Sequence, residues 1–470
     1  MKNLRNCAAL LLTLGLGASL TACKDPLNIQ PQQSVDASTA LSTSTKVGSA
    51  VVGIYAKLDD PALYGTNLVL LPELIGGDGY VSWQGTFQSY REVSRRTLIR
   101  TNTEAERTWA RAYEGINQCN LVLEALPVVA DTALKSQYAG EARFVRGALY
   151  FELVRLYAQQ YRTSDAATQP GVPLALVANR TVGQVDAPLP RATVAAVYNQ
   201  VLADLRTAAV RLPVDNGTRA TRYAAKAMLA RVYLQQGNYV AARAAADEVI
   251  TRSGKVLAAT LASVFSNKNS AESLFEIQQN DQNNAGTSND GLATFFASDG
   301  GTGRGDVRVL SNFSSRYEPN DARGEDTVSA GQTKKLIYVG NGNRPGFLRS
   351  IKWRQYGQNI PIIRLAEMYL IRAEADVRAN NTTSALADVN LIRARSGASP
   401  LTTITLQDVL NERQLELAFE GFHIHDLKRT GTNIVVNATT TLPITAAKLV
   451  LPIPQHDINV DPSLTQNTGY

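Results

Sequence analysis

Residues 222–250 read RYAAKAMLARVYLQQGNYVAARAAADEVI and carry the sharpest pattern in the chain. Small and aromatic side chains recur here at helical spacing, at Leu229, Ala230, Tyr233, Gly237, Tyr239, Ala242 and Ala246. Small side chains let two antiparallel helices approach closely, and Gly237 with Asn238 supplies the turn between them. The stretch therefore predicts a helical hairpin, with helices at 221–236 and 239–252.

These contact positions are similar to those of a tetratricopeptide repeat. A looser copy lies at Ala373, Asn380 and Ala385, and the helices expected at 132–160 and 191–211 form a further candidate pair. Long insertions separate the copies. The sequence thus predicts degenerate helical repeats rather than a regular solenoid.

Hydrophobic periodicity extends the helical prediction over much of the chain. In the helix at 132–160, one apolar face is formed by Ala142, Val145, Leu149, Leu153 and Leu156. Pro127 and Pro213 sit just past helix ends, where proline stops a helix. Besides the helices named above, we expect helices at 38–59, 102–126, 361–379, 383–396 and 405–420.

Residues 253–360 differ from the helical parts in composition. They are rich in Gly, Asn, Ser and Asp, as at 280–286 and 299–303. The alternating segment Lys335–Val339 predicts a short strand. Long loops on a compact domain are usually functional or disordered, and the helical scaffold behind these loops favours function for some of them.

The first 22 residues predict a secretory signal peptide, because Lys2 and Arg5 precede an apolar run too short to span a bilayer. The sequence Leu-Thr-Ala-Cys that ends at Cys23 resembles the bacterial lipobox, which implies cleavage before Cys23 and acylation of its thiol, for example with palmitate. The polar residues 23–36 then predict a lipidated tether. An ordinary secreted protein with an incidental Cys23 is the alternative.

Charge and cysteine content limit the possible functions. The net charge of +6 falls to about +4 without Lys2 and Arg5, and there is no dense Lys/Arg run, so nucleic-acid binding is not expected. Cys7 leaves with the signal peptide, and Cys119 lies in an apolar helical pattern typical of a core residue. With Cys23 acylated, the mature chain cannot form an intramolecular disulfide.

Four blocks of the chain resemble the SusD/RagB family of Bacteroidetes outer-membrane lipoproteins. The blocks are residues 140–157; 364–375 with 390–395; 412–421 with 426–429; and 451–455 with 466–470. They follow the lipobox in order, so the resemblance covers essentially the whole chain.

The resemblance implies a mainly α-helical SusD-like fold, in which tetratricopeptide-like helix pairs support a loop-rich, irregular ligand-binding half with short strands. It implies one SusD-like domain at 37–470, with a helical scaffold at 37–252 and 361–430, a loop-rich insertion at 253–360 and a family tail at 440–470.

The resemblance also implies nutrient capture without catalysis. Family members are thought to sit as lids on TonB-dependent outer-membrane transporters of the SusC/RagA type and to hand them oligosaccharides or, in some members, peptides. We therefore expect a surface-facing lipoprotein, anchored in the outer membrane through Cys23, with neither cofactor nor metal. The pair Lys24-Asp25 resembles the surface-export signal of Bacteroidetes lipoproteins. A lipid-anchored tetratricopeptide adaptor that binds a protein partner is the alternative.

Two segments hold candidate ligand-binding residues, because sugar binding needs flat apolar faces beside hydrogen-bonding side chains. The first candidates are Asp78, Tyr80, Trp83 and Gln84, in a glycine-rich stretch without helical pattern. Their position matches the loop after the first helix, where family members place ligand-contacting aromatics. The alternative is a turn whose Trp83 packs into the scaffold.

The second candidates lie in the insertion and are Phe295, Phe296, Asp299 and Arg304. Trp353 follows a strand-like alternation at 349–356 and Trp109 lies inside a helix, so both are expected in the core. With three Trp in the chain, a long aromatic arc for starch is less expected than a site for other glycans, peptides or small organic nutrients.

A carboxylate stripe raises the question of a metal or acid–base site. It comprises Glu412, Glu416, Glu420, His423, His425 and Asp426. No zinc-type His spacing occurs, and Arg413, Lys428 and Arg429 are close enough to pair with the carboxylates, so the stripe is expected to be structural. A surface glycosidase stays an alternative, although nothing pairs two carboxylates at a defined separation.

Overall fold

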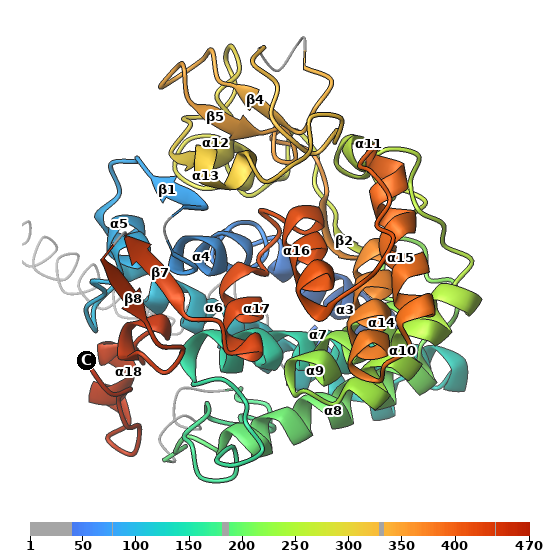
Figure 1. Cartoon of the computed structure of the whole chain (residues 1–470). Helices are drawn as coiled ribbons and strands as arrows, with labels where there is room; N and C mark the ends of the chain where they lie inside the picture. Colours follow the sequence, from blue (N-terminus) through green and yellow to red (C-terminus); the bar gives the residue numbers. More distant parts are fainter. Residues whose placement is uncertain (1–39, 78, 181–187, 329–332, 438) are drawn as a thin grey trace, which may run out of the picture.

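The computed structural model describes residues 40–77, 79–180, 188–328, 333–437 and 439–470. The repeat helices form one row in which each helix packs on the next, from α6 through α10 to α14 and α15 (Figure 1). The principal helices are α3 (Ser44–Leu58), α6 (Thr103–Ala125), α7 (Thr132–Tyr157), α8 (Val194–Arg211), α9 (Arg222–Gln235), α10 (Tyr239–Arg252), α14 (Leu365–Arg378), α15 (Thr382–Ser396) and α16 (Leu406–Glu416).

The hairpin predicted from residues 222–250 is confirmed as α9 and α10. The side chain of Thr221 caps α9 by accepting from the backbone N–H of Ala224, and Asn238 caps α10 in the same way through Ala241. The looser copy is the pair α14 and α15, and the third predicted pair is α7 and α8. Within these pairs the predicted small contacts are buried: Ala230, Ala242, Ala246, Ala373 and Ala385.

Short elements that the sequence analysis did not predict complete the helical part. They are α4 (Asn67–Ile75), α5 (Gln88–Arg95), α17 (His423–Thr430), α18 (Gln455–Val460), and the 3-10 turns η1 (Leu126–Val128) and η3 (Ala447–Leu449). The loop-rich lobe, which we define as residues 253–360, adds α11 (Leu261–Ser266), α12 (Leu292–Phe296) and α13 (Ser311–Ser314).

The strands are short and form antiparallel pairs. The pairs in the described residues are β1 (Val81–Trp83) with β3 (Val307–Val309), β2 (Ser273–Ile277) with β6 (Ile360–Arg364), β4 (Ile337–Val339) with β5 (Leu348–Ser350), and β7 (Ile434–Asn437) with β8 (Thr440–Leu442). The expected mainly helical class with short strands is thus confirmed.

Three predicted element boundaries were wrong. The helix expected from residue 361 begins at Leu365, because the buried run before it pairs with β2 as strand β6, and periodicity alone cannot separate such a run from a buried helix. Helix α16 ends at Glu416 instead of 420, since Phe419 (φ +67°) and Gly421 (φ +85°) turn the chain. The strand expected at 349–356 ends at Ser350.

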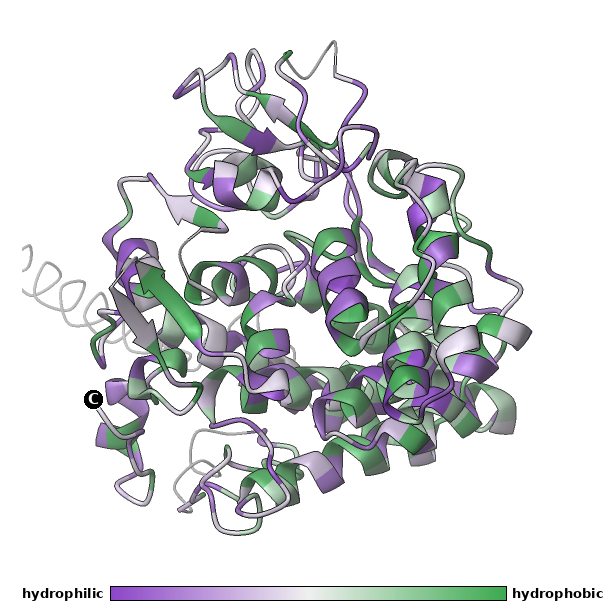
Figure 2. Ribbon diagram, viewed as in Figure 1, coloured by the Kyte–Doolittle hydropathy of each residue, from purple (hydrophilic) through white to green (hydrophobic). Residues whose placement is uncertain are grey.

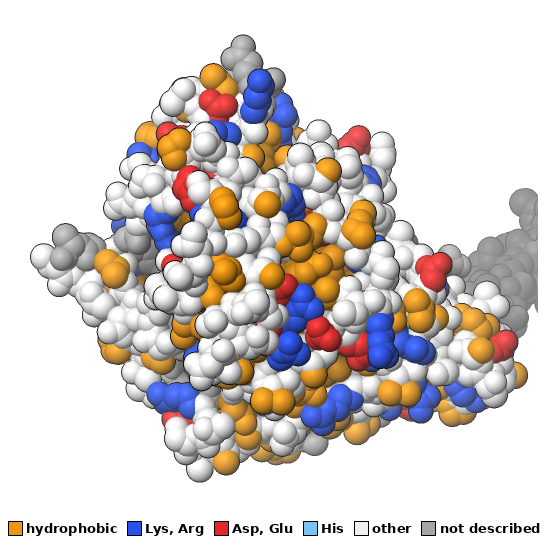
Figure 3. Space-filling view, turned by 45° about the vertical axis from the view of Figure 1, so that its right-hand side comes forward, with side chains coloured by type: hydrophobic (Ala, Val, Ile, Leu, Met, Phe, Trp, Pro, Cys, Tyr) orange, Lys and Arg blue, Asp and Glu red, His pale blue; other side chains and the backbone are white. Residues whose placement is uncertain are grey.

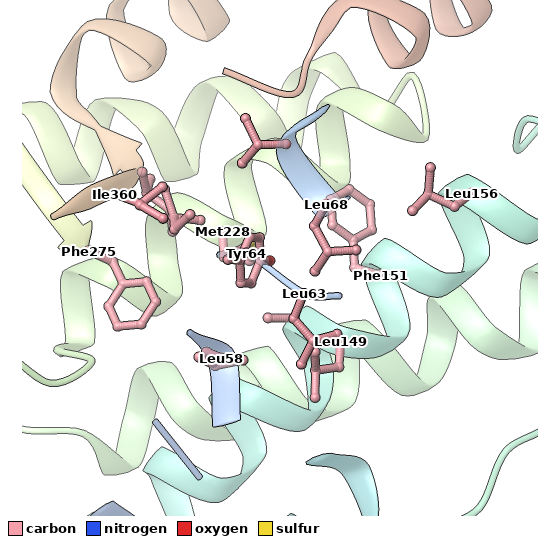
Figure 4. Close-up of a cluster of buried hydrophobic side chains, with 14 of the residues drawn as sticks. Leu58, Leu63, Tyr64, Leu68, Leu149, Phe151, Leu156, Met228, Phe275 and Ile360 are labelled. Carbon is pink, nitrogen blue, oxygen red and sulfur yellow. The ribbon is translucent and has the colours of Figure 1, made fainter. Parts of the chain in front are cut away.

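One extended hydrophobic core joins the early helices to the repeat row and to the β2–β6 pair. Leu58, Leu63 and Leu68 from the start of the chain meet Leu149 and Phe151 of α7, beside Met228, Phe275 and Ile360 (Figure 4). Hydropathy alternates around the scaffold helices, whereas the loops of the lobe are mostly hydrophilic or neutral (Figure 2). No helix in the described ranges is long and apolar enough to cross a membrane.

Candidate ligand-binding site

The two predicted site segments lie side by side, although more than 200 residues separate them. Strand β1 follows Tyr80 and pairs antiparallel with β3, which follows Arg304, in the register Val81↔Val309 and Trp83↔Val307. The backbone N–H of Gln84 extends the pairing by donating to the carbonyl of Asp306 at 2.7 Å. One β-ladder therefore fixes both segments against each other.

Tyr80 is a core residue in the structure. Its ring is 3 % exposed and packs on Phe313, Phe419 and His423, with ring centroids 4.6, 5.3 and 4.1 Å away. Its hydroxyl donates to the Glu73 carboxylate and accepts from the Phe419 N–H. Burial raises the pKa of Glu73 to about 7. Because the ring packs on three neighbouring rings and the hydroxyl is hydrogen-bonded inside the protein, Tyr80 does not belong to the surface over strand β1.

Trp83, Phe295 and Phe296 form the floor beneath the surface rather than the surface itself. Phe295 and Phe296 are fully buried, and the Trp83 ring, 9 % exposed, packs edge-on against Phe295 at 5.2 Å. Trp83 therefore packs inward, as in the alternative interpretation of this segment. Its indole N–H nevertheless has no hydrogen-bond partner among the described residues.

The surface above this floor carries Arg304 and a residue that the sequence analysis missed, Phe87. The Arg304 guanidinium lies 4.7 Å from the centre of the partly exposed Phe87 ring. It also donates to Thr86 Oγ1 and to the carbonyl of Ser288, each at 3.1 Å. Gln84, half-buried beside them in sequence, has an Oε1 without a partner in the described structure. We call Gln84, Thr86, Phe87 and Arg304 the β1 surface.

Asp306 sets the charge balance of the β1 surface. Its buried carboxylate pairs with Arg304 (3.1 Å) and with Arg344, both about a quarter exposed. Burial raises the pKa of Asp306, and the two guanidiniums act against that rise. A further guanidinium, that of Arg308 on β3, lies 4.5 Å from the centre of the Phe347 ring. Hydrogen-bond donors and aromatic faces therefore outnumber carboxylates here.

The remaining candidate residues lie elsewhere. Asp299 forms an ion pair with Arg354 at 2.6 Å in the lobe, and no hydrogen bond or ion pair joins it to the β1 surface in the described structure. Asp78 and Cys23 lie outside the described residues. Trp353 and Trp109 are in the core as expected, and the Trp353 indole donates to the Phe419 carbonyl at 2.7 Å. Cys119 is also buried, and desolvation raises its pKa.

The predicted carboxylate stripe begins on α16 and continues beyond its end, and its carboxylates form ion pairs, mostly with residues that the sequence did not suggest. Arg413 and Arg429 pair with Asp426, but Glu412, Glu416 and Glu420 pair with cations from the lobe, β6 and α15. We call this group the ionic seam; its members are Glu272, Arg323, Lys352, Arg364, Arg395, Glu412, Glu416 and Glu420. No cluster of metal-ligating side chains occurs in the part of the chain that the structure describes.

Figure 3 shows the types of side chain on one face of the molecule. Hydrophobic side chains gather in the middle of this face, between the protruding lobe and the helical scaffold, with acidic and basic side chains beside them. The helical-repeat scaffold carries loops whose guanidiniums and aromatic rings are partly exposed, and the carboxylates of the ionic seam are paired. This arrangement suits a binding protein.

Comparison with known proteins agrees with this class. A family model described as "Starch-binding associating with outer membrane" matches residues 28–234, and a SusD family model matches residues 348–441. SusD-like protein P38 of Formosa agariphila is 24 % identical over the full length of both chains. The starch-binding protein SusD of Bacteroides thetaiotaomicron is 32 % identical over 183 residues, about a third of each chain.

Solved structures share the fold. A putative sugar binding protein from Bacteroides vulgatus superposes with a TM-score of 0.80 at 25 % identity, covering 92 % of this chain and all of the other. A laminarin binding SusD-like protein gives a TM-score of 0.72 at 23 % identity, covering 91 % of this chain and all of the other. The chain is a SusD/RagB family protein with the mainly helical SusD-like fold, and it is a binding protein rather than an enzyme.

Proposed function

We propose that this chain captures carbohydrate at the β1 surface and delivers it to a SusC/RagA-type TonB-dependent transporter in the outer membrane. The observation that carries the proposal is the Arg304 guanidinium stacked on Phe87, on a ladder that two distant segments build together. An aromatic ring offers an apolar face to sugar C–H groups, and a guanidinium donates to hydroxyl oxygens.

Two unpaired polar atoms support a polar ligand at this place. The Trp83 indole N–H and the Gln84 side-chain oxygen lack partners in the described structure, and buried polar groups generally have one. The names of the relatives, which refer to starch, laminarin and sugar, favour a glycan over a peptide. A peptide ligand is the second outcome that a binding experiment distinguishes.

Binding to a panel of glycans and peptides, measured by calorimetry or affinity gels, tests the proposal. Removing one stacked aromatic or guanidinium typically costs about 1–2 kcal/mol, so Phe87→Ala and Arg304→Ala should each weaken glycan binding about tenfold. Arg252→Ala, at an exposed site on α10, is the matched control and should bind normally. If the panel yields no ligand, or if both variants bind as well as the wild type, the proposal fails.

The membrane anchor and the partner need separate experiments. We propose that acylated Cys23 holds the chain at the outer surface, so Cys23→Ala should release a folded, ligand-competent protein from the membrane. Membrane retention of that variant would contradict the anchor. Pull-down of the anchored protein should recover a large barrel transporter, whereas recovery of an assembly factor would favour the adaptor function.

A further inference from the structure

A hollow between α16 and α17 lies next to the Tyr80 ring. Its volume, measured for the centres of water-sized molecules, is about 110 Å³. Because a single water needs about 10–15 Å³ on this measure, the hollow has room for several waters or for one compact ring. Its walls include the apolar side chains of Leu410, Leu417, Phe422 and Leu427. We call it the α16–α17 pocket.

Inside the pocket, Arg413 has an unused hydrogen-bond donor. The side chain is 2 % exposed and its Nε donates to Asp426 Oδ2 at 2.9 Å. Its Nη1 is buried and has no partner among the described residues. Asp426, the carboxylate in the pocket wall, is also paired with Arg429 at 2.6 Å. The Arg413 guanidinium in the pocket wall therefore has one N–H donor for which the described residues supply no acceptor.

At the edge of the pocket, Arg316 adds a positive charge. This exposed guanidinium donates to the side-chain oxygens of Gln414 and Asn411, both of which line the pocket. No carboxylate in the described ranges lies within ion-pair distance of Arg316. The amides thus hold a cation at the pocket without neutralising it.

The rings in the wall are uncharged and suit an apolar face. The His423 ring packs against Tyr80 at a tilt, with the ring centroids 4.1 Å apart. Burial lowers the pKa of His423 to about 4, so the imidazole is neutral at physiological pH. Side-chain amides and the hydroxyls of Thr430 and Thr432 complete the lining. The occupant that fits is a small ring with C–H faces, hydroxyl groups and one anionic group.

We propose that the α16–α17 pocket binds one carboxylate-bearing sugar residue, a uronic acid unit, whose oxygens accept from Arg413 Nη1 while its carboxylate faces Arg316. This inference rests on the proposed carbohydrate-binding function and narrows it to acidic glycans. The pocket would thus bind an acidic sugar residue, whereas the β1 surface would bind the apolar faces of neutral sugars.

Calorimetry with the mature chain tests the inference with two matched probe pairs: oligogalacturonate and oligoglucuronate, each as the free acid and as the methyl ester. We expect the acid form of at least one pair to bind tenfold or more tighter than its ester. Arg316→Gln should remove that preference and leave ester binding unchanged. Leu410→Trp, which fills the pocket without touching an ion pair, should abolish binding of the acid form.

The controls separate this inference from the proposed function. Arg252→Gln should retain the preference, and thermal unfolding should show that every variant is folded. Neutral glycan binding that depends on Arg304, combined with equal affinity for acid and ester or with no response to Leu410→Trp, overturns the pocket assignment alone. If no glycan of either kind binds, the carbohydrate function itself fails, and the inference fails with it.

Discussion

Helix α9 of the scaffold and the loop-rich lobe differ in how many charged side chains they bury. The buried residues of α9 are mostly apolar, among them Ala224, Ala225, Ala227 and Met228, and Arg231 is the one charged residue among them. The lobe instead buries charged side chains, among them Arg323, Arg349 and Lys352. Apolar contacts hold α9 in place, whereas the lobe adds paired charges and hydrogen bonds to the apolar contacts of residues such as Phe295 and Phe296.

The difference follows from what each region can bury. Helices satisfy their own backbone groups, so their faces are free to pack small apolar side chains. The lobe has short strands and long loops, and its unpaired backbone carbonyls need donors: Arg349 donates to the carbonyls of Val307 and Arg344 at 2.6 and 3.2 Å. Lys352 of the lobe also donates to the carbonyls of Glu416 and Ala418, at the end of α16, at 2.8 and 2.9 Å. The ionic seam thereby connects the lobe to α16 of the scaffold.

The largest effect is expected where the ionic seam is broken. Arg364 is buried and pairs with Glu272, Glu416 and Glu420, so Arg364→Met removes a cation that all three carboxylates contact. Removing one partner of a buried ion pair costs about 3–5 kcal/mol of unfolding free energy. Urea unfolding should show this loss of unfolding free energy. Arg252→Met at an exposed site should change stability by less than about 0.5 kcal/mol. A loss below about 1 kcal/mol would mean that the lobe does not depend on the seam.

A somewhat smaller effect is expected from a cavity in the scaffold. Leu149 is fully buried in α7, and its Cδ1 lies against Gly115 of α6, where an added Cβ would approach to 2.8 Å. Leu149→Ala should cost about 2–5 kcal/mol by losing contacts and leaving a void. Leu391→Ala, at a leucine 44 % exposed on α15, is the control and should be nearly neutral. Equal losses in both variants would contradict close packing of the row.

A third prediction concerns Lys428, a buried lysine of the scaffold that lies outside the ionic seam. Lys428 is buried in α17 and forms no ion pair in the described structure; burial lowers its pKa from 10.5 to about 7. The unfolded chain therefore binds more protons between pH 7 and 10, so stability should rise with pH in this window, by at most about 1.4 kcal/mol per pH unit.

Lys428→Met should remove this rise and make the protein more stable at pH 7. Unfolding free energies at pH 7, 8 and 9 measure the difference between variant and wild type. The exposed Lys334→Met is the control and should follow the wild-type profile. Parallel profiles for wild type and Lys428→Met would show that the ammonium is accommodated without cost.

The smallest effects on stability are expected from the helix caps, and they should be equal in the scaffold and in the lobe. Thr221 caps α9 in the scaffold and Thr260 caps α11 in the lobe, each accepting one backbone N–H at 3.2 Å. Because a cap is a local interaction, Thr221→Ala and Thr260→Ala should each cost about 1 kcal/mol, as measured by thermal or urea unfolding. Costs that differ by more than about 1 kcal/mol would show that even capping depends on the region.

The sequence alone determined the repeat helices, because their signal is local. The small residues from Leu229 to Ala246 recur with the helical period, and α9 and α10 form where that period predicts. The resemblance in the four family blocks likewise pointed to the SusD/RagB fold before any contact was known. Arg304 is about a quarter exposed in the structure, and its role as a ligand contact stays a prediction.

Only the tertiary structure decided which aromatic residues face solvent. Tyr80 accepts its hydrogen bond from Phe419, 339 residues away, and Trp83 is covered by Phe295 from the lobe. Nothing in the local pattern of a loop encodes such partners, so Phe87 at the surface and Trp83 in the floor looked alike in sequence. Helical periodicity is a property of neighbouring residues, whereas burial of a loop residue is set by whatever distant segment packs against it.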